Sequence, residues 1–185
     1  LLWSMSSLKN QILISRPHMI DSIFSKSVIY ICAHDKKGAT GLIINKKIQN
    51  HNKNLVNYKD FELDPKLYST LYFGGPVSIS NAIVLHHKIY SDSDALKVSD
   101  TIAITNKQKT LEKIINKKST AFKLILGHCG WVPNQLEKEI RRGDWFIQET
   151  TADFVFNFPS KQMWEHATFS LGVDVESFFV NHGKS

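Results

Sequence analysis

Three short stretches of this sequence are largely apolar and show no alternation of apolar and polar residues, and they constrain the fold more than any other feature. They cover residues 27–34, 39–44 and 121–126. A strand with one solvated face alternates apolar and polar residues, whereas a strand that is apolar throughout must be covered on both faces. The sequence therefore predicts three central strands in one sheet, with other elements packed over both faces.

The first two runs are predicted to form a hairpin. Between them stand the turn residues 35–38, Asp-Lys-Lys-Gly, of which Gly38 can adopt a positive φ. The returning strand ends at Asn45, whose side chain would by default form an Asx turn.

The third run leads into the segment 127–133, Gly-His-Cys-Gly-Trp-Val-Pro. We expect its two glycines and its proline to turn the chain before a helix begins. A strand, a glycine turn and a helix N-terminus in this order often bind ligands. The same arrangement is also a common connection between two elements.

The helix after this segment is predicted from Leu136 and Ile140, which stand four residues apart on one face. Asn134 can cap this helix, with Glu137 at the third position as in a capping box. Alternatively, Pro133 opens the helix as its first residue.

The remaining chain alternates predicted strands and helices without a repeat or a linker. Helices are expected over 107–117, capped by Asn106, and from Ser160 to Gly172, with a short one near 55–61. Further strands are expected at 11–15, 71–73, 82–87, 95–98, 101–105 and 144–150, with short elements at 154–158 (a strand) and 174–180. Hairpin strands with helices among them indicate an α+β domain with a mostly antiparallel or mixed sheet.

Length and composition favour one cytoplasmic domain over residues 1–185. The chain is 42% hydrophobic, which suffices for a full core. It has no run of the ~18 apolar residues that a membrane helix needs, and its start lacks the pattern of a signal peptide. Met5 could be the initiator. The two cysteines indicate a reducing compartment rather than a disulfide framework.

The net charge of +6 does not by itself indicate a nucleic-acid-binding protein. Nearly all of the positive charge is lysine, and base readout depends on the bidentate fork of arginine. The lysines are also dispersed in pairs, as on a solvated surface. We therefore expect no sequence-specific nucleic-acid binding, although lysines suffice for nonspecific phosphate contacts.

Several residues could carry chemistry, and each also has a structural interpretation. Cys129 resembles a nucleophile elbow, but the second glycine of that motif is missing, so a small buried residue is the better interpretation. His86 and His87 would point to opposite faces of a strand and cannot share one metal. His34 is interpreted as a satisfied polar residue or a ligand contact, and Trp131 as a core anchor rather than a stacking platform.

Taken together, these stretches resemble the YqgE/AlgH family of bacterial proteins. The resemblance is carried by Pro17, Asp21, Phe24, Ser27, Val28, His34 and residues 38–46, by Gly74-Gly75-Pro76-Val77 with Leu85-His86, by Gly127, Gly130-Trp131, Gln135-Leu136-Glu137, Glu139-Ile140 and Trp145, and by Trp164 with residues 171–174. The chain departs from the family pattern at His128-Cys129, where Tyr-Ala is usual, at Asn134, where Gly is usual, and at Lys47, where Pro is usual.

The resemblance implies a cytoplasmic α+β domain with a bulged, partly rolled sheet and flanking helices. It implies no established catalytic residue and no cofactor, and members of the family are often labelled transcriptional regulators. The usual alanine at position 129 argues against a catalytic cysteine.

We interpret the chain as a non-catalytic binding or regulatory module that acts through a protein or small-molecule contact, without a metal or cofactor. The candidate binding surface comprises His34, Asn45, Gly74, Gly75, Pro76, His86, Gly127, Gly130, Trp131, Gln135 and Glu137. We expect the glycine motifs to converge, with Trp131 packed over their junction and Asn45 and Gln135 at its rim. The alternative is an enzyme that uses a polar cluster of His34, Asn45, His86 and Gln135.

Overall fold

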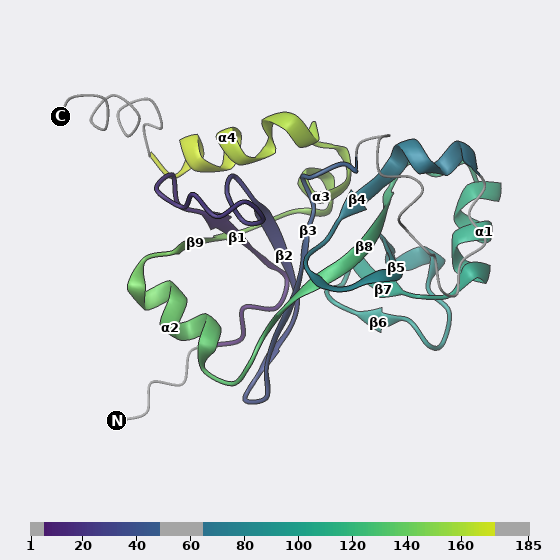
Figure 1. The fold of residues 1–185 in the computed structure, drawn as a ribbon. Coiled ribbons are helices and arrows are strands. Elements are labelled where there is room, and N and C mark those ends of the chain that lie inside the picture. Colours follow the sequence, from purple (N-terminus) through teal and green to yellow (C-terminus); the bar gives the residue numbers. More distant parts are fainter. Residues whose placement is uncertain (1–5, 49–64, 173–185) are drawn as a thin grey trace.

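The computed structural model describes residues 6–48 and 65–172, and its elements alternate between strands and short helices (Figure 1). In chain order they are β1 (Gln11–Ser15), β2 (Val28–Asp35), β3 (Gly38–Ile43), the 3₁₀ helix η2 (Pro65–Thr70), β4 (Leu71–Phe73), β5 (Val77–His87), the 3₁₀ helix η3 (Lys88–Tyr90), β6 (Leu96–Lys97), β7 (Ile102–Thr105), α1 (Gln108–Asn116), β8 (Phe122–Trp131), α2 (Gln135–Arg142), β9 (Trp145–Glu149), α3 (Ala152–Asn157) and α4 (Ser160–Ser170).

These strands form one curled, half-barrel sheet of nine strands, which confirms the predicted α+β class. The order is β6-β7-β5-β8-β3-β2-β1-β9, and every pair along it is antiparallel. Only β4, which pairs with β8 off this path, is parallel to its neighbour. Register shifts interrupt the β2–β3 and β5–β8 pairs. Such bulges bend a sheet, in keeping with the bulged, rolled sheet that the family resemblance implied.

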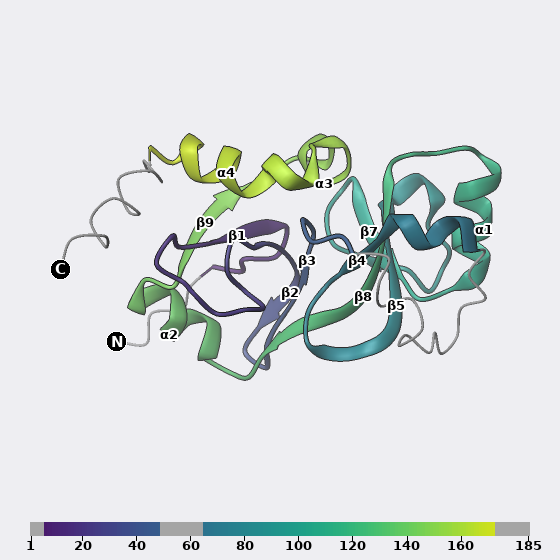
Figure 2. The same cartoon turned by 45° about the horizontal axis from the view of Figure 1, so that its top comes forward.

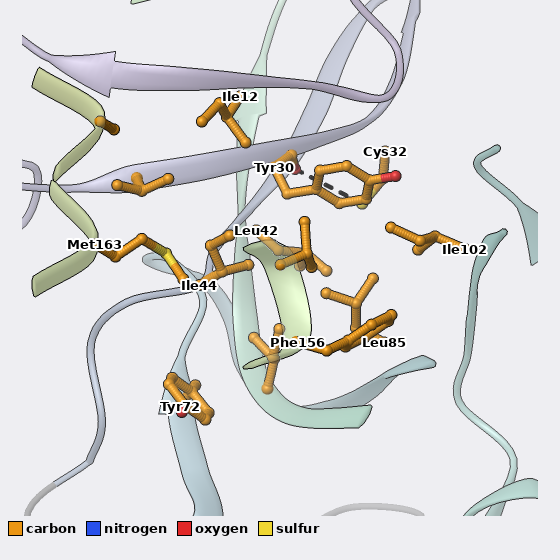
Figure 3. Close-up of a cluster of buried hydrophobic side chains, with 14 of the residues drawn as sticks. Ile12, Tyr30, Cys32, Leu42, Ile44, Tyr72, Leu85, Ile102, Phe156 and Met163 are labelled. Carbon is orange, nitrogen blue, oxygen red and sulfur yellow. Dashed lines mark hydrogen bonds between the residues drawn. The ribbon is translucent and has the colours of Figure 1, made fainter. Parts of the chain in front are cut away.

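The three apolar runs occupy β2, β3 and β8, near the middle of the sheet, as predicted. Helices α3 and α4 cover one face of the β1–β2–β3 region, while α2 covers the other (Figures 1 and 2). Helix α1 packs Leu111 and Ile114 against β5 and β8. Figure 3 shows the core between the sheet and helices α3 and α4, where Tyr30, Leu42 and Met163 meet. Both faces of the central strands are therefore buried.

The segment 127–130 is not the turn that its glycines predicted. It lies inside β8, which continues to Trp131, and the chain turns only over residues 132–134. The first part of β8 pairs with β4 and β5, and its last part pairs with β3. Gly127, at φ +73°, stands where the strand passes from one set of neighbours to the other. Its glycine serves a bend within a strand rather than a connection.

The helices predicted over 107–117, after residue 134 and from Ser160 are present, but the predicted caps are not. Lys107 rather than Asn106 holds the N-cap position of α1, and its side chain makes no capping bond. Asn134 holds the N-cap position of α2 in the left-handed region, at φ +65°, so its side chain does not cap either, and Pro133 lies outside the helix. Pro159, not Ser160, precedes α4.

The strand expected at 154–158 is wrong, because these residues lie largely in helix α3. The hydroxyl of Thr151 accepts a hydrogen bond from the backbone N–H of Phe154, which caps a short helix. Val155 and Phe156 then face the core. The expected elements at 55–61 and 174–180 lie outside the described residues. Within the described part of the chain, no helix is long and apolar enough to cross a membrane.

Candidate functional site

Most of the predicted site residues gather where β8 ends, between the tip of the β2–β3 hairpin and helix α2. On the α2 side, His34 and Glu137 form a partly buried polar pair, with 2.7 Å between Nε2 and Oε1. The backbone N–H of Leu8 donates to Nδ1 of His34 at 2.9 Å, so Nε2 carries the proton that it donates to Glu137. This pair ties the N-terminal segment, the hairpin and α2 together.

The pKa of Glu137 is lowered in this environment. Burial acts to raise it, but the hydrogen bond from His34 and the nearby positive charge of Arg141 outweigh the burial. Glu137 is therefore ionised at neutral pH and serves as the acceptor that orients the imidazole. With one nitrogen accepting from Leu8 and the other donating to Glu137, both ring nitrogens of His34 are occupied within the described structure.

Glu139, one turn along α2 from Gln135, anchors the two tryptophans at this end of the sheet. Its Oε2 accepts hydrogen bonds from the indole N–H groups of Trp131 and Trp145, both at 2.9 Å. Its Oε1 accepts from the side-chain amide of Gln135, also at 2.9 Å. We call this set of four residues the carboxylate clamp. Because Trp131 and Trp145 are both buried, the clamp satisfies two donors that would otherwise lack partners.

The rings of the clamp also pack on one another. Trp131 and Trp145 meet edge to face, with centroids 6.5 Å apart and an interplanar angle of 80°, and Phe24 packs in the same way on Trp145 at 5.9 Å. This agrees with the interpretation of Trp131 as a core anchor.

The predicted convergence of the glycine motifs on β8 is confirmed. A Cβ on Gly74 would lie 2.3 Å from the carbonyl oxygen of Gly127, and one on Gly75 would lie 2.3 Å from the carbonyl of His128. A Cβ on Gly41 would lie 3.3 Å from the ring of Trp131. Close backbone approach therefore requires glycine at positions 74 and 75, whereas at position 41 the space is taken by the side chains of Ile29, Ile31 and Trp131. Gly130 differs, because a Cβ there would meet only a methyl of Val77, at 4.0 Å.

The face of the sheet opposite α2 is open at this end. Ala33, Thr40 and Gly130 are neighbours across β2, β3 and β8, and they line a shallow depression of about 370 Å³. Val132, 66% exposed, also belongs to its lining, and two further exposed apolar residues, Val77 (42%) and Ile79 (55%), lie on the neighbouring strand β5. Val77 lies beside Gly130, and the backbone of Ile79 lies against Gly127. We call these six residues (Ala33, Thr40, Val77, Ile79, Gly130 and Val132) the hairpin surface.

The depression itself is bordered by charged groups of the hairpin tip. Asp35 and Lys37 are exposed and belong to its lining, and Lys36 is exposed between them. The carboxylate of Asp35 accepts a hydrogen bond from the backbone N–H of Lys37 at 2.7 Å, so this carboxylate is engaged in ordering the turn.

Cys129 lies at the other face of β8, under Gly74. Its thiol donates to the carbonyl oxygen of Gly74 at 3.3 Å, and burial raises the pKa of the thiol to about 12. A protonated, buried thiol is a poor nucleophile. The geometry thus agrees with a small residue in a crowded position.

Two predicted site residues lie elsewhere. The side chain of Asn45 accepts from the backbone N–H of Val28 and donates to the carbonyl oxygen of Lys26, both at 2.9 Å, so it orders a turn instead of forming the rim of Trp131. His86 is fully buried beneath α1. The polar cluster of His34, Asn45, His86 and Gln135 is therefore not formed.

His86 is nevertheless unusual. Its Nδ1 donates to the carbonyl oxygen of His87 at 2.9 Å, and its buried Nε2 has no partner among the described residues. Burial lowers the pKa of His86, with opposing contributions from His87 and Asp92 and a smaller lowering by Lys113. Within the described part of the chain, no group of three or more His, Cys, Asp or Glu side chains is placed to hold a metal ion.

The structure thus places His34, Trp131, Gln135 and Glu137 together on the α2 side of the sheet. Gly130 lies on the opposite face, in the floor of the depression. Pro76 is exposed next to the Gly74–Gly75 contact. Glu139, Trp145 and Val132 were missed as partners of this region. The four-residue spacing of Gln135 and Glu139 on the predicted helix is the signal that could have identified the clamp.

Comparison with known proteins identifies sequences that are related to this chain. A family model described as AlgH-like (DUF179) matches residues 12–176. A UPF0301 protein of Shewanella frigidimarina is 36% identical over 176 residues, which cover 92% of this chain and 95% of the relative. The UPF0301 protein Mmwyl1_0539 of Marinomonas sp. is 37% identical over 182 residues, covering 96% of this chain and 97% of the relative.

Two solved structures share the fold. The solution structure of the AlgH protein from Pseudomonas aeruginosa has a TM-score of 0.73 and 28% identity, and the match covers 98% of this chain and 96% of that one. The crystal structure of protein DIP2367 from Corynebacterium diphtheriae has a TM-score of 0.70 and 21% identity, covering 90% and 88% of the two chains, and supports the fold alone.

Proposed function

This chain belongs to the AlgH-like family, and on that premise we propose that it is a non-catalytic module that binds a partner protein through the hairpin surface. The observation that carries the proposal is that exposed Val132 lines a depression with a floor of small residues, and that exposed Val77 and Ile79 of β5 lie next to Gly130 and Gly127 of the adjoining strand. Large exposed apolar side chains that gather on one face often mark protein contacts.

The shape of the surface favours a protein over a small molecule. Small-molecule sites enclose most of their ligand's surface, roughly 70–90%. The depression is shallow and opens to solvent along its length, so a small ligand would remain largely exposed. A protein segment that crosses β2, β3 and β8 and reaches the start of β5 would instead contact the three apolar side chains together.

The charges at the border define the chemistry of the partner. Lys36 and Lys37 stand exposed at the hairpin tip, with Asp35 engaged by the turn. The complementary partner is a protein segment with apolar side chains flanked by carboxylates. Charge complementarity of this kind mainly raises the association rate and weakens with salt.

The scaffold behind the surface is held together by side-chain hydrogen bonds between α2 and the sheet. The carboxylate clamp and the His34–Glu137 pair fix α2 against the back of the same strands. Binding would then need little reordering of the backbone, and the cost of association is reduced accordingly.

Site-specific photo-crosslinking tests the proposal. A photoreactive phenylalanine analogue replaces Val132 in one variant and Phe169 in the control, because Phe169 is 79% exposed on α4, away from the hairpin surface. In extract from the native organism, we expect one saturable protein adduct from position 132 that position 169 does not form. Val132→Glu should abolish binding of that protein, and Phe169→Glu should not.

Three results would overturn the proposal: the same adducts from both positions, an adduct that nuclease treatment removes, or unchanged binding by folded Val132→Glu. Gly130→Glu provides a second charge in the floor of the depression, at a position with room for a side chain. Lys37→Glu should slow association and reduce its salt dependence while leaving the fold intact.

A further inference from the structure

The two edges of the sheet are built differently, and only one of them is protected against further pairing. At one edge, β6 consists of Leu96 and Lys97 alone. Such short strands, and lysine side chains, are common means by which proteins prevent an edge strand from pairing with another chain. At the other edge, β9 pairs with β1 without a bulge from Trp145 to Glu149, and it contains neither proline nor lysine (Figure 1). This edge is a ready template for one more strand.

The hydrogen bonds between β1 and β9 show which backbone groups of β9 face outward. The backbone N–H of Arg16 donates to the carbonyl oxygen of Asp144 at 3.2 Å, and this pair continues the antiparallel register of the two strands. Bonded and non-bonded residue pairs alternate along an antiparallel ladder, so Phe146 and Gln148 also bond to β1. The backbones of residues 145, 147 and 149 therefore point away from β1. Within the described part of the chain, their N–H and C=O groups have no hydrogen-bond partner.

We propose that β9 pairs with β9 of a second copy of this chain, antiparallel and centred on Ile147. A two-fold axis through this position places Ile147 of one copy opposite Ile147 of the other, and Trp145 of each copy opposite Glu149 of the other. Each of these residue pairs has outward backbone groups on both strands, so each exchanges two backbone hydrogen bonds. The two sheets then continue into one another across the axis.

The side chains of β9 fit the same arrangement. Phe146 packs at the edge of the core beneath α4, and Ile147 packs at the edge of the core beneath α2, so the two side chains lie on opposite faces of the strand. Both are only partly buried in the single chain. In the pair, Ile147 contacts its counterpart on one face and Phe146 contacts Gln148 on the other. Pairing thus removes further apolar surface from water on both faces of the sheet.

The charges near the two ends of β9 favour antiparallel pairing with a second copy. Glu149 is exposed at one end, and Arg141 and Arg142 are exposed just before the other end, in the last turn of α2. Arg142 is bound to Asp144 of its own chain, so Arg141 is the main source of positive charge there. Antiparallel pairing brings Glu149 of each copy to the arginine end of the other. Parallel pairing in register would instead place the two Glu149 carboxylates side by side, which is unfavourable.

Sedimentation equilibrium of the full chain, from micromolar to millimolar concentration, tests the proposal. We expect a reversible equilibrium between one chain and a dimer of twice 21.1 kDa. Glu149→Pro removes an outward N–H without breaking a bond to β1, and should weaken the dimer by about tenfold or more, because both copies lose a hydrogen bond. Glu149→Ala keeps the N–H and should weaken it much less. Circular dichroism confirms that both variants fold.

Cysteine crosslinking tests the register. Ile147→Cys should form a disulfide between copies under mild oxidation, because opposite Cα atoms in a bonded pair lie about 5.5 Å apart. Glu149→Cys is the control, since residue 149 is more exposed but the two copies of it would lie about 14 Å apart along the strands. The native Cys32 and Cys129 are buried and should remain reduced.

Three results would overturn this assignment: a single chain at every concentration up to millimolar, a dimer that Glu149→Pro does not weaken, or crosslinking at position 149 as readily as at position 147. The test is independent of the hairpin surface. Val132→Glu, which should abolish binding of the partner protein there, should leave the dimer unchanged.

Discussion

Replacing Glu139 with alanine is expected to destabilise the whole domain, because two buried tryptophans depend on this one side chain. Glu139→Ala removes the acceptor for the indole N–H groups of Trp131 and Trp145. A buried donor left without a partner costs about 1–3 kcal/mol. The Gln135 amide, at the same carboxylate, is only partly buried and can turn to water.

Adding the two indoles gives an expected loss of about 2–6 kcal/mol in the free energy of unfolding, a large share of the roughly 5–15 kcal/mol typical of a domain. In a chain of 185 residues this corresponds to a fall in Tm of roughly 4–24 °C. Urea unfolding, followed by tryptophan fluorescence and by circular dichroism, measures the change.

Two variants of the same helix serve as controls. Glu139→Gln keeps a carbonyl acceptor and should cost less than half as much. Lys138→Ala changes an exposed neighbour and should alter stability by less than about 0.5 kcal/mol. If Glu139→Ala matched Lys138→Ala, the indoles would have other partners in the folded state, and the clamp would have no role in stability.

Further predictions concern the glycines, the thiol, the buried histidine and nucleic acid. Gly75→Ala should unfold the domain or destabilise it by more than about 3 kcal/mol in urea titrations, since its Cβ would strike the β8 backbone at 2.3 Å, whereas Gly130→Ala should be nearly neutral. Cys129→Ala should cost about 1–2 kcal/mol in the same titrations and leave partner binding intact, and lost binding by the folded variant would refute a purely structural thiol. Burial lowers the pKa of His86 in the folded state, so the unfolded chain takes up the proton first. Stability should therefore fall as pH drops below about 6.5, by up to about 1.4 kcal/mol per pH unit, and His86→Gln should reduce this slope in melts recorded across pH. Electrophoretic shifts with duplex DNA should show only weak, nonselective binding that is lost at physiological salt, and a sequence-selective complex there would contradict it.

The sequence predicted the central strands well because these strands lack the alternation of apolar and polar residues that a strand with one solvated face shows. The runs in β2, β3 and β8 have no polar side, and the hairpin at Gly38 has turn chemistry that allows few alternatives. Local patterns failed where a tertiary contact decides the conformation. Residues 154–158 look like a strand by composition, but a single cap at Thr151 and the core beneath them select a helix.

The role of the glycines could be predicted only in part. Their need for close backbone approach is visible in the sequence, yet a glycine before a helix suggests a turn as readily as a bend within a strand. Only the pairing of β8 with strands far away in sequence distinguishes these cases. In the same way, Asn45 and His34 are both polar residues at strand ends. The local pattern indicates a turn at Asn45 itself, but not that its side chain binds the backbone of Lys26 and Val28, and nothing local indicates that His34 binds α2.

The position of β8 has a consequence for how this chain is made. β8 is synthesised after β1, β2, β3, β4, β5 and β7, yet it lies between β3 and β5 and pairs with β4 as well. Until Trp131 has left the ribosome, β3 and β5 each present an unpaired edge. The outer edge of β1 stays unpaired for longer, until β9 has been synthesised. Exposed edges of this kind invite pairing with other chains. Nascent chains that stop short of β8 should therefore be the species that aggregate and recruit chaperones, while those that extend past β9 should not.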